Sequence, residues 1–194
     1  MPATSLKEFL ELVRQQPGKL NYASSGNGTV NHMLGEMFRK ATGTDIVHVP
    51  YKGNAPALQD FFVGRVQVMF YPAAGPILNQ IKEGKIRGYA VTTKFKVASL
   101  PELPTLDSTA IRGFEVSAWH AMWAPKGLPR DVSDKLVSAL QIALKDPKVI
   151  ERFASLGTEP VAPAMATPEV LKSHLAAEVP RWAAVIKAAG VKGN

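Results

Sequence analysis

The chain has 194 residues, of which 46% are hydrophobic and 20% charged, a balance typical of a globular protein of one or two domains that buries a sizeable core. Cysteine is absent, so disulfide bonds and thiolate chemistry are excluded, while the redox compartment stays open. The formal charge of +7 comes from basic residues scattered singly, with no basic run interleaved with aromatic residues. We therefore expect no nucleic-acid partner, but some attraction for anions.

Helix-like and strand-like patterns alternate through the first hundred residues. The first helix begins at a capping-box pattern, Ser5 with Glu8 three residues later, and ends at Pro17 and Gly18. The next predicted elements are a strand over 20–23, a helix over 29–43, a strand over 46–49, a helix over 54–62, a strand over 66–70, a helix over 76–83 and a strand over 86–93. Strands that alternate with helices of this length predict an α/β fold with a parallel sheet and right-handed crossovers.

The composition changes after about residue 100, where prolines become frequent. One strand-like piece is predicted over 114–119, followed by helices over 132–144, 147–156 and 168–189. These residues hold too few strands to close a sheet of their own. We expect them to be part of a domain whose remaining strands lie elsewhere.

Two loops rich in small residues, at 24–29 and 51–54, each follow a predicted strand and precede a predicted helix. Glycines let a backbone approach a ligand, and the unpaired N–H groups of the following helix turn attract an anion, so this arrangement indicates a carboxylate or phosphate cradle. Either loop alone is explained more simply as an ordinary strand-to-helix turn. Ligands of open parallel sheets, however, bind beyond the carboxyl ends of the strands, where these loops and those at 71–75 and 92–96 are expected to converge.

Catalytic patterns are weak. The sequence around Ser24 and Ser25 is not a Gly-x-Ser-x-Gly elbow, and no acid-then-histidine order supports a triad. His32 lies one helical turn past Thr29 and is expected to form hydrogen bonds rather than act as a base, whereas His48 alternates within a strand and is expected to pack. The histidines lack the spacing of metal ligands, and the glycines match neither a phosphate-binding P-loop nor a dinucleotide fingerprint. We expect no metal and no cofactor, and keep a small hydrolase or transferase using Ser25 and His32 as the alternative function.

A family resemblance is carried by spaced motifs in the correct order. They are Pro17-Gly18-Lys19-Leu20-Asn21-Tyr22, Ser24-Ser25-Gly26-x-Gly28-Thr29-x-x-His32, His48-Val49-Pro50-Tyr51-Lys52-Gly53, Gly84-Lys85-x-Arg87 with Ala90-Val91-Thr92, Leu103-Pro104-Thr105, Trp119 with Ala124-Pro125-x-Gly127-x-Pro129, Gly157 before Glu159-Pro160, and Glu178 to Trp182 to Ala189-Gly190. The chain resembles, over essentially its whole length, the substrate-binding proteins of tripartite tricarboxylate transporters, the Bug or TctC family.

The resemblance implies a fold like that of type II periplasmic binding proteins, with two α/β lobes. Residues 1–116 would form the second, ligand-binding lobe, and residues 117–194 would be the C-terminal portion of an incomplete first lobe. Family members carry the other strands of the first lobe, a further Gly-rich ligand loop and a signal peptide upstream of the position of Met1. The first thirty residues here lead straight into an amphipathic pattern with no apolar core of a signal peptide, so a chain lacking its N-terminal part is expected.

The resemblance also implies a function and a site. The function is that of a periplasmic receptor for a small organic carboxylate, a di- or tricarboxylate or related acid, which delivers it to the membrane components of the transporter and catalyses nothing. The ligand-binding residues carried over are Ser24, Ser25, Gly26, Gly28, Thr29, His32, Tyr51, Lys52 and Gly53. Tyr71 stands where the family often has an acidic residue that would meet an ammonium group, which favours a plain organic acid over an amino acid.

Two further expectations concern the incomplete lobe. Unpaired strand edges and an uncovered apolar face would favour association, and a homodimer would cover both copies at once. A chain that no longer binds ligand, a truncated remnant, stays open as a third reading of the sequence.

Overall fold

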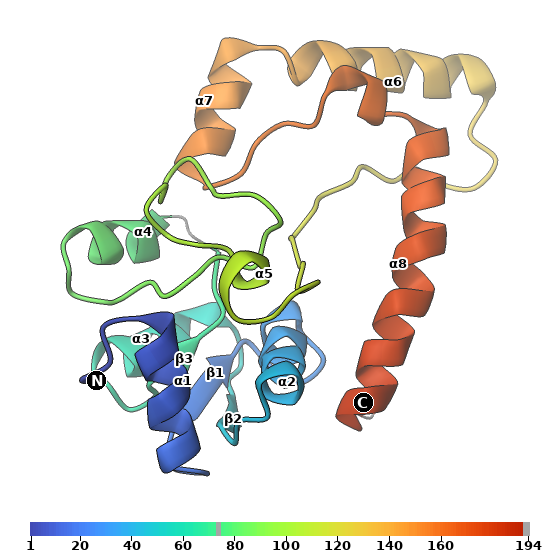
Figure 1. Cartoon of the computed structure of the whole chain (residues 1–194). Coiled ribbons are helices and arrows are strands. Elements are labelled where there is room, and N and C mark those ends of the chain that lie inside the picture. Colours follow the sequence, from blue (N-terminus) through green and yellow to red (C-terminus); the bar gives the residue numbers. More distant parts are fainter. Residues whose placement is uncertain (73–74, 192–194) are drawn as a thin grey trace. The chain divides into compact units, whose positions relative to one another are not determined.

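The structure of the chain, a computed structural model, describes residues 1–72 and 75–191 (Figure 1). In chain order its elements are α1 (Leu6–Gln15), β1 (Asn21–Ser24), α2 (Val30–Thr42), β2 (Val47–Pro50), α3 (Asn54–Phe62), β3 (Val68–Met69), α4 (Gly75–Lys82), α5 (Leu106–Thr109), α6 (Arg130–Ala143), α7 (Pro147–Ser155), the 3-10 helix η1 (Pro163–Met165) and α8 (Pro168–Ala189). They form two compact units, unit 1 with Met1–Ala118 and Ala183–Asn194, and unit 2 with Trp119–Trp182. The predicted division into lobes over residues 1–116 and 117–194 stays a prediction.

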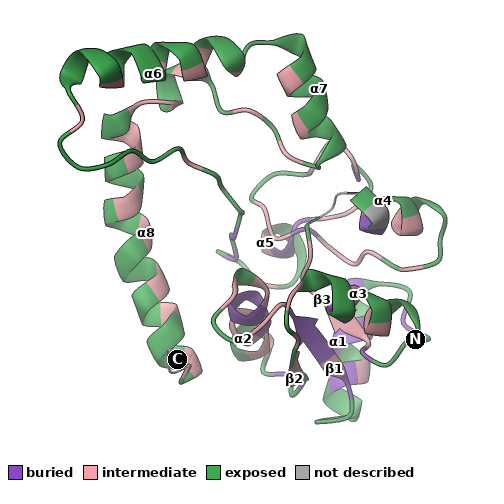
Figure 2. Ribbon diagram, turned by 180° about the vertical axis from the view of Figure 1, so that it is seen from behind, coloured by how far each residue is buried: buried purple, intermediate pink, exposed green. Residues whose placement is uncertain are grey.

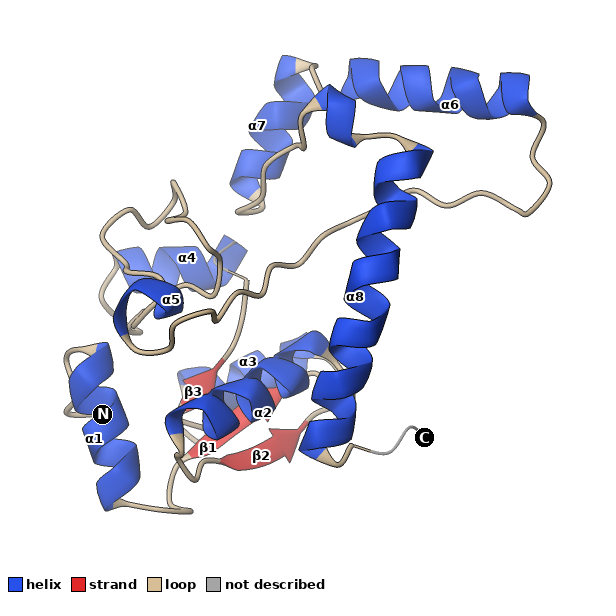
Figure 3. Cartoon of the chain, turned by 45° about the vertical axis from the view of Figure 1, so that its right-hand side comes forward, coloured by secondary structure: helices blue, strands red, loops and turns tan. Residues whose placement is uncertain are grey.

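Unit 1 is built on a parallel sheet with the strand order β2-β1-β3. The helices α2 and α3, which follow β1 and β2 along the chain, lie on opposite faces of this sheet (Figure 3). Right-handed crossovers require this arrangement, because the chain moves from β1 to β2 in one direction and from β2 to β3 in the other. The direction of the strand order therefore reverses beside β1, and ligands of open parallel sheets bind at such a reversal, beyond the carboxyl ends of the strands.

The central strand β1 lies in the core of unit 1, as its burial shows (Figure 2). Tyr22, Ala23 and Ser24 are completely buried. Successive side chains of a strand point to opposite faces, so Ala23 packs with Ala57 of α3 while Tyr22 faces α2. Close packing at the α2 face is visible at Gly35, where a Cβ atom would lie 2.1 Å from Cε2 of Tyr22.

Most predicted helices are confirmed. The predicted ranges 54–62 and 168–189 coincide with α3 and α8, and α2 ends where Gly43 adopts the left-handed conformation that terminates helices. The Ser5 hydroxyl caps α1 by accepting the Glu8 N–H, but the Glu8 carboxylate bonds to the N–H and hydroxyl of Thr4, one residue earlier than in a capping box.

Two predicted strands are wrong. The segment 86–93 forms a single parallel bridge, between Val91 and Thr105, and the segment 114–119 forms none. Val116 instead exchanges two hydrogen bonds with Thr92, one from its N–H to the Thr92 carbonyl and one from the Thr92 hydroxyl to its own carbonyl, each 2.8 Å long. A strand needs a ladder of hydrogen bonds to a neighbouring strand, and β-forming residues alone do not supply that neighbour.

Unit 2 consists of helices and connecting segments, and among its residues, all of which the structure describes, there is no β-strand. The helices α6 and α7 have no buried residue (Figure 2). Large apolar side chains such as Trp123 and Ile142 are exposed by 64% and 72%. The prediction that this part of the chain contains too few strands for its own sheet is confirmed. Throughout the described residues, we find no helix with the length and apolarity needed to cross a membrane.

Candidate functional site

The first loop (residues 24–29) and the second loop (residues 51–54) lie side by side at the carboxyl edge of the sheet. They follow β1 and β2, which are parallel neighbours with Ser24 paired to Pro50. The N–H of Tyr51 donates to the Ser24 carbonyl at 3.0 Å, and the N–H of Gly53 donates to the Ser25 carbonyl at 3.1 Å. The two loops, separated in the sequence, therefore form one hydrogen-bonded edge.

Both loops lead into helices whose first turns have no side-chain cap. The N-cap residues are Thr29 for α2 and Gly53 for α3, and neither forms a side-chain hydrogen bond to its helix. By contrast, Ser5, Thr105 and Asp146 cap their helices with side-chain oxygens. The first N–H groups of a helix have no intrahelical acceptor and carry the positive end of the helix dipole. Two such ends at one sheet edge can hold an anion.

The Ser24 hydroxyl is used inside the first loop. Its Oγ atom lies 2.6 Å from Nε2 of His48, accepts the Gly26 N–H at 3.2 Å and donates to the Gly26 carbonyl at 3.1 Å. Ser24 is also completely buried. Its side chain is therefore suited to fix the shape of the loop, and its predicted contact with a ligand has no support from this geometry.

A column of three rings stands beside the first loop. The ring of His32, from α2, stacks on that of His48, from β2, with centroids 3.8 Å apart and planes 6° apart. The His48 ring stacks in turn on Tyr22 of β1, with centroids 4.9 Å apart. The Tyr22 hydroxyl donates to Glu36 at 2.8 Å. The pKa of Tyr22 is raised, mainly by burial and to a smaller extent by this hydrogen bond.

Both histidines of the column favour the neutral form. Burial, together with the nearby His32, lowers the pKa of His48 to about 4, and burial also lowers the pKa of His32, against a smaller opposite effect of Glu36. Nδ1 of His32 accepts the N–H of Gly28 at 3.1 Å. The prediction that His48 packs is confirmed. The sequence did not indicate its hydrogen bond to Ser24, because the alternation of residues in a strand shows on which face of the sheet a side chain lies and not which residue it contacts.

The remaining predicted residues are placed differently from one another. The Thr29 hydroxyl donates to the Gly26 carbonyl at 2.7 Å, inside the first loop. The Tyr51 hydroxyl donates to Asp60 at 2.8 Å, and Asp60 also pairs with Arg65. Lys52 is exposed and belongs to none of the ion pairs of the described residues. Lys52 therefore carries an exposed positive charge that no ion pair among the described residues uses.

The other two loops expected at this edge are less well connected to it. The predicted loop 71–75 includes residues 73 and 74, which lie outside the described residues, although Asn31 of α2 donates to the Phe70 carbonyl at 2.6 Å, next to the end of β3. In the loop 92–96, Lys96 donates to the Pro101 carbonyl at 2.9 Å. The convergence of this loop with the first two stays a prediction.

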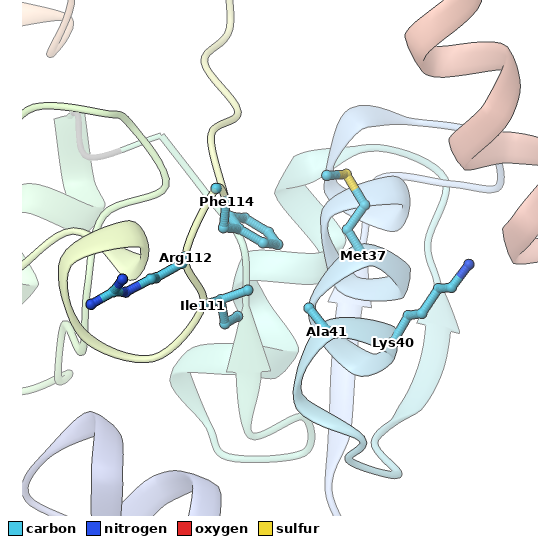
Figure 4. Close-up of a pocket in the computed structure, with 7 residues that line it drawn as sticks. Met37, Lys40, Ala41, Ile111, Arg112 and Phe114 are labelled. Atoms are coloured by element: carbon cyan, nitrogen blue, oxygen red, sulfur yellow. The ribbon is translucent and has the colours of Figure 1, made fainter.

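A separate hollow of about 460 Å³ lies at the other end of α2 (Figure 4). It is lined by Met37, Lys40, Ala41, Ile111, Arg112, Gly113 and Phe114. In Figure 4 the charged ends of Lys40 and Arg112 point away from one another. An α-helix rises about 1.5 Å per residue, so this hollow is roughly 15 Å from the first turn of α2. It has no converging polar groups, and the loops are the better candidate. No cluster of three metal-ligating side chains occurs among the described residues.

Comparison with known proteins identifies the family. The family model of the tripartite tricarboxylate transporter family receptor, TctC, matches residues 1–191. The chain belongs to this receptor family. The expected resemblance is thereby confirmed, as is the α/β fold of the periplasmic binding protein type.

Relatives and solved structures agree with this membership. A UPF0065 protein in the TAR-I ttuE-ttuC' intergenic region of Agrobacterium vitis is 44% identical over 94% of this chain and 53% of its own length, and BugT of Bordetella pertussis is 32% identical over 97% and 56%. The periplasmic binding protein BugD matches all of this chain and 64% of its own, with 41% identity and a TM-score of 0.86. Rpa4515 of R. palustris, solved with adipate, is 33% identical over 98% of this chain and 62% of its own, with a TM-score of 0.85.

A further solved relative, MatC from Rhodopseudomonas palustris with bound malate, is 30% identical over 95% of this chain and 63% of its own, with a TM-score of 0.82. The chain thus spans about half the length of these curated relatives and under two thirds of these solved ones. The family and its solved members are solute-binding proteins, which agrees with the expectation that the chain is not an enzyme.

Proposed function

We propose that the chain acts as a solute receptor for a small organic carboxylate, held at the edge formed by the first and second loops. The observation that carries this proposal is the pair of uncapped helix N-termini, at Thr29 and Gly53, on two hydrogen-bonded loops. Helix ends of this kind supply N–H donors and a positive dipole without a bound counter-charge. A carboxylate satisfies both.

The side chains of the loops favour the same ligand class. Neither loop contains an acidic residue, and Lys52 adds an exposed positive charge. An ammonium group would find no carboxylate partner in the two loops, so a plain organic acid fits better than an amino acid. The adipate and malate bound by two solved relatives belong to the class we propose.

The predicted residues have different parts in this proposal. Ser25, Lys52, Gly53 and the first-turn N–H groups after Thr29 face the ligand, and Gly26 and Gly28 allow the close approach of the backbone. Gly26 and Gly28 have φ values of 138° and 76°, conformations that favour glycine. Ser24 and Tyr51 support the loops from behind through His48 and Asp60.

The test is a thermal-unfolding screen of the 194-residue chain. Adipate and malate should raise the melting temperature, since a ligand that binds only the folded state stabilises it, while glucose and glycine should not. Sodium chloride at equal ionic strength is the control for a general salt effect. Stabilisation by sugars or nucleotides alone would overturn the proposal, and stabilisation by nothing would support the reading as a remnant that does not bind.

A hydrolase or transferase using Ser25 and His32 is the alternative function. The geometry disfavours it, because Nδ1 of His32 is occupied by the Gly28 N–H and the described contacts include no hydrogen bond between the two side chains. Turnover of generic acyl or phosphoryl esters that is lost on Ser25→Ala would support the alternative. The absence of turnover together with carboxylate binding would support the receptor.

The proposal includes two kinds of partner, the membrane components of a transporter and a second copy of the chain. We propose that the receptor works in the periplasm with the membrane components of a tripartite tricarboxylate transporter, and that two copies of the chain associate through unit 2. The exposed apolar side chains of α6 and of the segment before it support such an association.

A further inference from the structure

The N–H of Gly28 is already occupied in the structure. It donates to Nδ1 of His32 at 3.1 Å, and Gly28 is one of the residues that the proposed function places beside the ligand. The His32 ring thus sits where an anion would accept the bond. His32 is only 7% exposed, and its ring is packed against that of His48.

The hydrogen bond fixes the protonation of the His32 ring. Nδ1 accepts a proton-bearing donor, so Nδ1 carries no hydrogen, and the neutral ring has its hydrogen on Nε2. A ring that became charged would carry hydrogens on both nitrogens and could not accept the Gly28 N–H. Protonation of His32 and release of Gly28 are therefore one event.

The groups around His32 leave room for one added positive charge. His48 faces it from β2 as a stacked ring, Tyr22 lies behind His48 on β1, and Glu36 and Arg39 are on α2 itself. Burial and the proximity of His32 keep His48 neutral, since its pKa is lowered to about 4. Glu36 is the acidic group of this set and favours a charge on His32.

We propose that a bound carboxylate replaces Nδ1 of His32 as the acceptor of the Gly28 N–H. His32 then takes up one proton from solvent at Nδ1, and the charged ring donates a hydrogen bond from Nδ1–H to the same carboxylate. This inference rests on the proposed function and names how its site is controlled. One hydrogen bond is broken and two are formed, one of them between opposite charges. Receptor loading is thereby coupled to proton uptake.

The coupling has a definite sign. The carboxylate raises the pKa of His32 in the complex above that in the free chain, where burial lowers it. The complex then holds more protons than the free chain between these two pKa values, so affinity rises as the pH falls through this window, by up to about tenfold per pH unit. Above the pKa of the complex, affinity no longer depends on pH.

The experiment is titration calorimetry of the 194-residue chain with adipate in two buffers of different ionisation enthalpy. Near pH 7, where ordinary carboxyl groups with a pKa of about 4 are ionised, the buffer dependence of the heat gives the protons taken up per ligand. We expect an uptake approaching one for the unaltered chain and none for His32→Gln. His120→Gln is the matched control, since this histidine lies in unit 2, and it should keep the uptake.

Spectra of ¹⁵N-labelled histidine in the unaltered chain give a test that does not depend on any variant folding. His32 should have a hydrogen on Nε2 alone in the free chain and on both nitrogens with adipate bound. Binding with no proton uptake and an unchanged ring would overturn the coupling while leaving the receptor function intact. Failure of adipate and malate to bind at all would overturn both.

Discussion

The ring of His32 lies flat against the ring of His48, with 3.8 Å between their centroids. The parallel register of the sheet produces this contact, because Tyr22 of β1 is paired with His48 of β2 and both side chains face α2. His48 then bonds to Ser24 in the first loop, and His32 bonds to Gly28 in the same loop. Two histidines from different elements thus form hydrogen bonds to the first loop, one at Ser24 and one at Gly28.

The stability of the chain should fall as the pH is lowered from about 6.5 towards 4. The pKa of His48 is lowered from 6.5 to about 4 in the folded chain, mainly by burial, so the unfolded chain binds more protons in this interval. The contribution of neutral His48 to the free energy of unfolding is fully present above pH 6.5 and is lost as the pH falls to the pKa of His48 in the folded chain, about 4. Urea unfolding of the chain at a series of pH values measures it.

The matched variants for this pH dependence are His48→Gln and His120→Gln. The first removes the titrating ring of the column, so its unfolding free energy should vary less steeply with pH, and the second should keep the slope of the unaltered chain. An identical slope in His48→Gln would contradict the assignment to His48.

Gly35→Ala should destabilise the chain, although alanine normally stabilises a helix interior by about 1 kcal/mol relative to glycine. A Cβ atom at this position would lie 2.1 Å from Cε2 and 2.4 Å from Cζ of Tyr22. Overpacking of this kind costs about 1–3 kcal/mol or more. Chemical unfolding measures the loss.

A double variant isolates the clash between these two residues. Tyr22→Leu removes the ring atoms that the new methyl group would meet, so Gly35→Ala with Tyr22→Leu should lose less than the sum of the two single changes. A stabilised Gly35→Ala single variant would show that the ring moves aside at no cost.

Lys52→Met should weaken the binding of adipate by about two- to fivefold at low salt, because an exposed charge contributes up to about 1 kcal/mol. The effect should shrink at high salt, where charges are screened. Lys19→Met is the matched control, since Lys19 is also exposed but precedes β1 and lies at the opposite edge of the sheet. Calorimetric titrations in which both variants lose the same affinity would show a general charge effect instead of a site.

The chain should associate at micromolar concentration, because apolar side chains of unit 2 are exposed to solvent. Ile142→Ser and Trp123→Ser should shift light-scattering masses towards the monomer. Phe95→Ser changes an apolar side chain that is 75% exposed in unit 1 and should leave the mass unchanged. A monomeric unaltered chain would contradict the proposed self-association.

Local patterns predicted most of the fold. Helices such as α3 and α8 were found to their end residues, because apolar spacing and capping signals lie within the helix itself. The two failures, at 86–93 and 114–119, are segments whose β-forming residues find no neighbouring strand in the described structure. For the candidate site, the position of the ligand-binding residues stays a prediction. Its loops were found from their glycines, but the partners of Ser24 and Tyr51 were not.

By itself, the sequence determined the alternation of helices and strands over the first seventy residues, the two glycine loops and the family to which the chain belongs. Only the tertiary structure decided which hydrogen bonds join the two loops, that Ser24 is buried against His48, and that the Gly28 N–H bonds to His32. The physical reason is the separation along the chain over which each kind of interaction acts. Helix periodicity and turn chemistry act between residues a few positions apart, whereas the register that brings His48 beside Tyr22 depends on how strands from distant parts of the chain pair and pack.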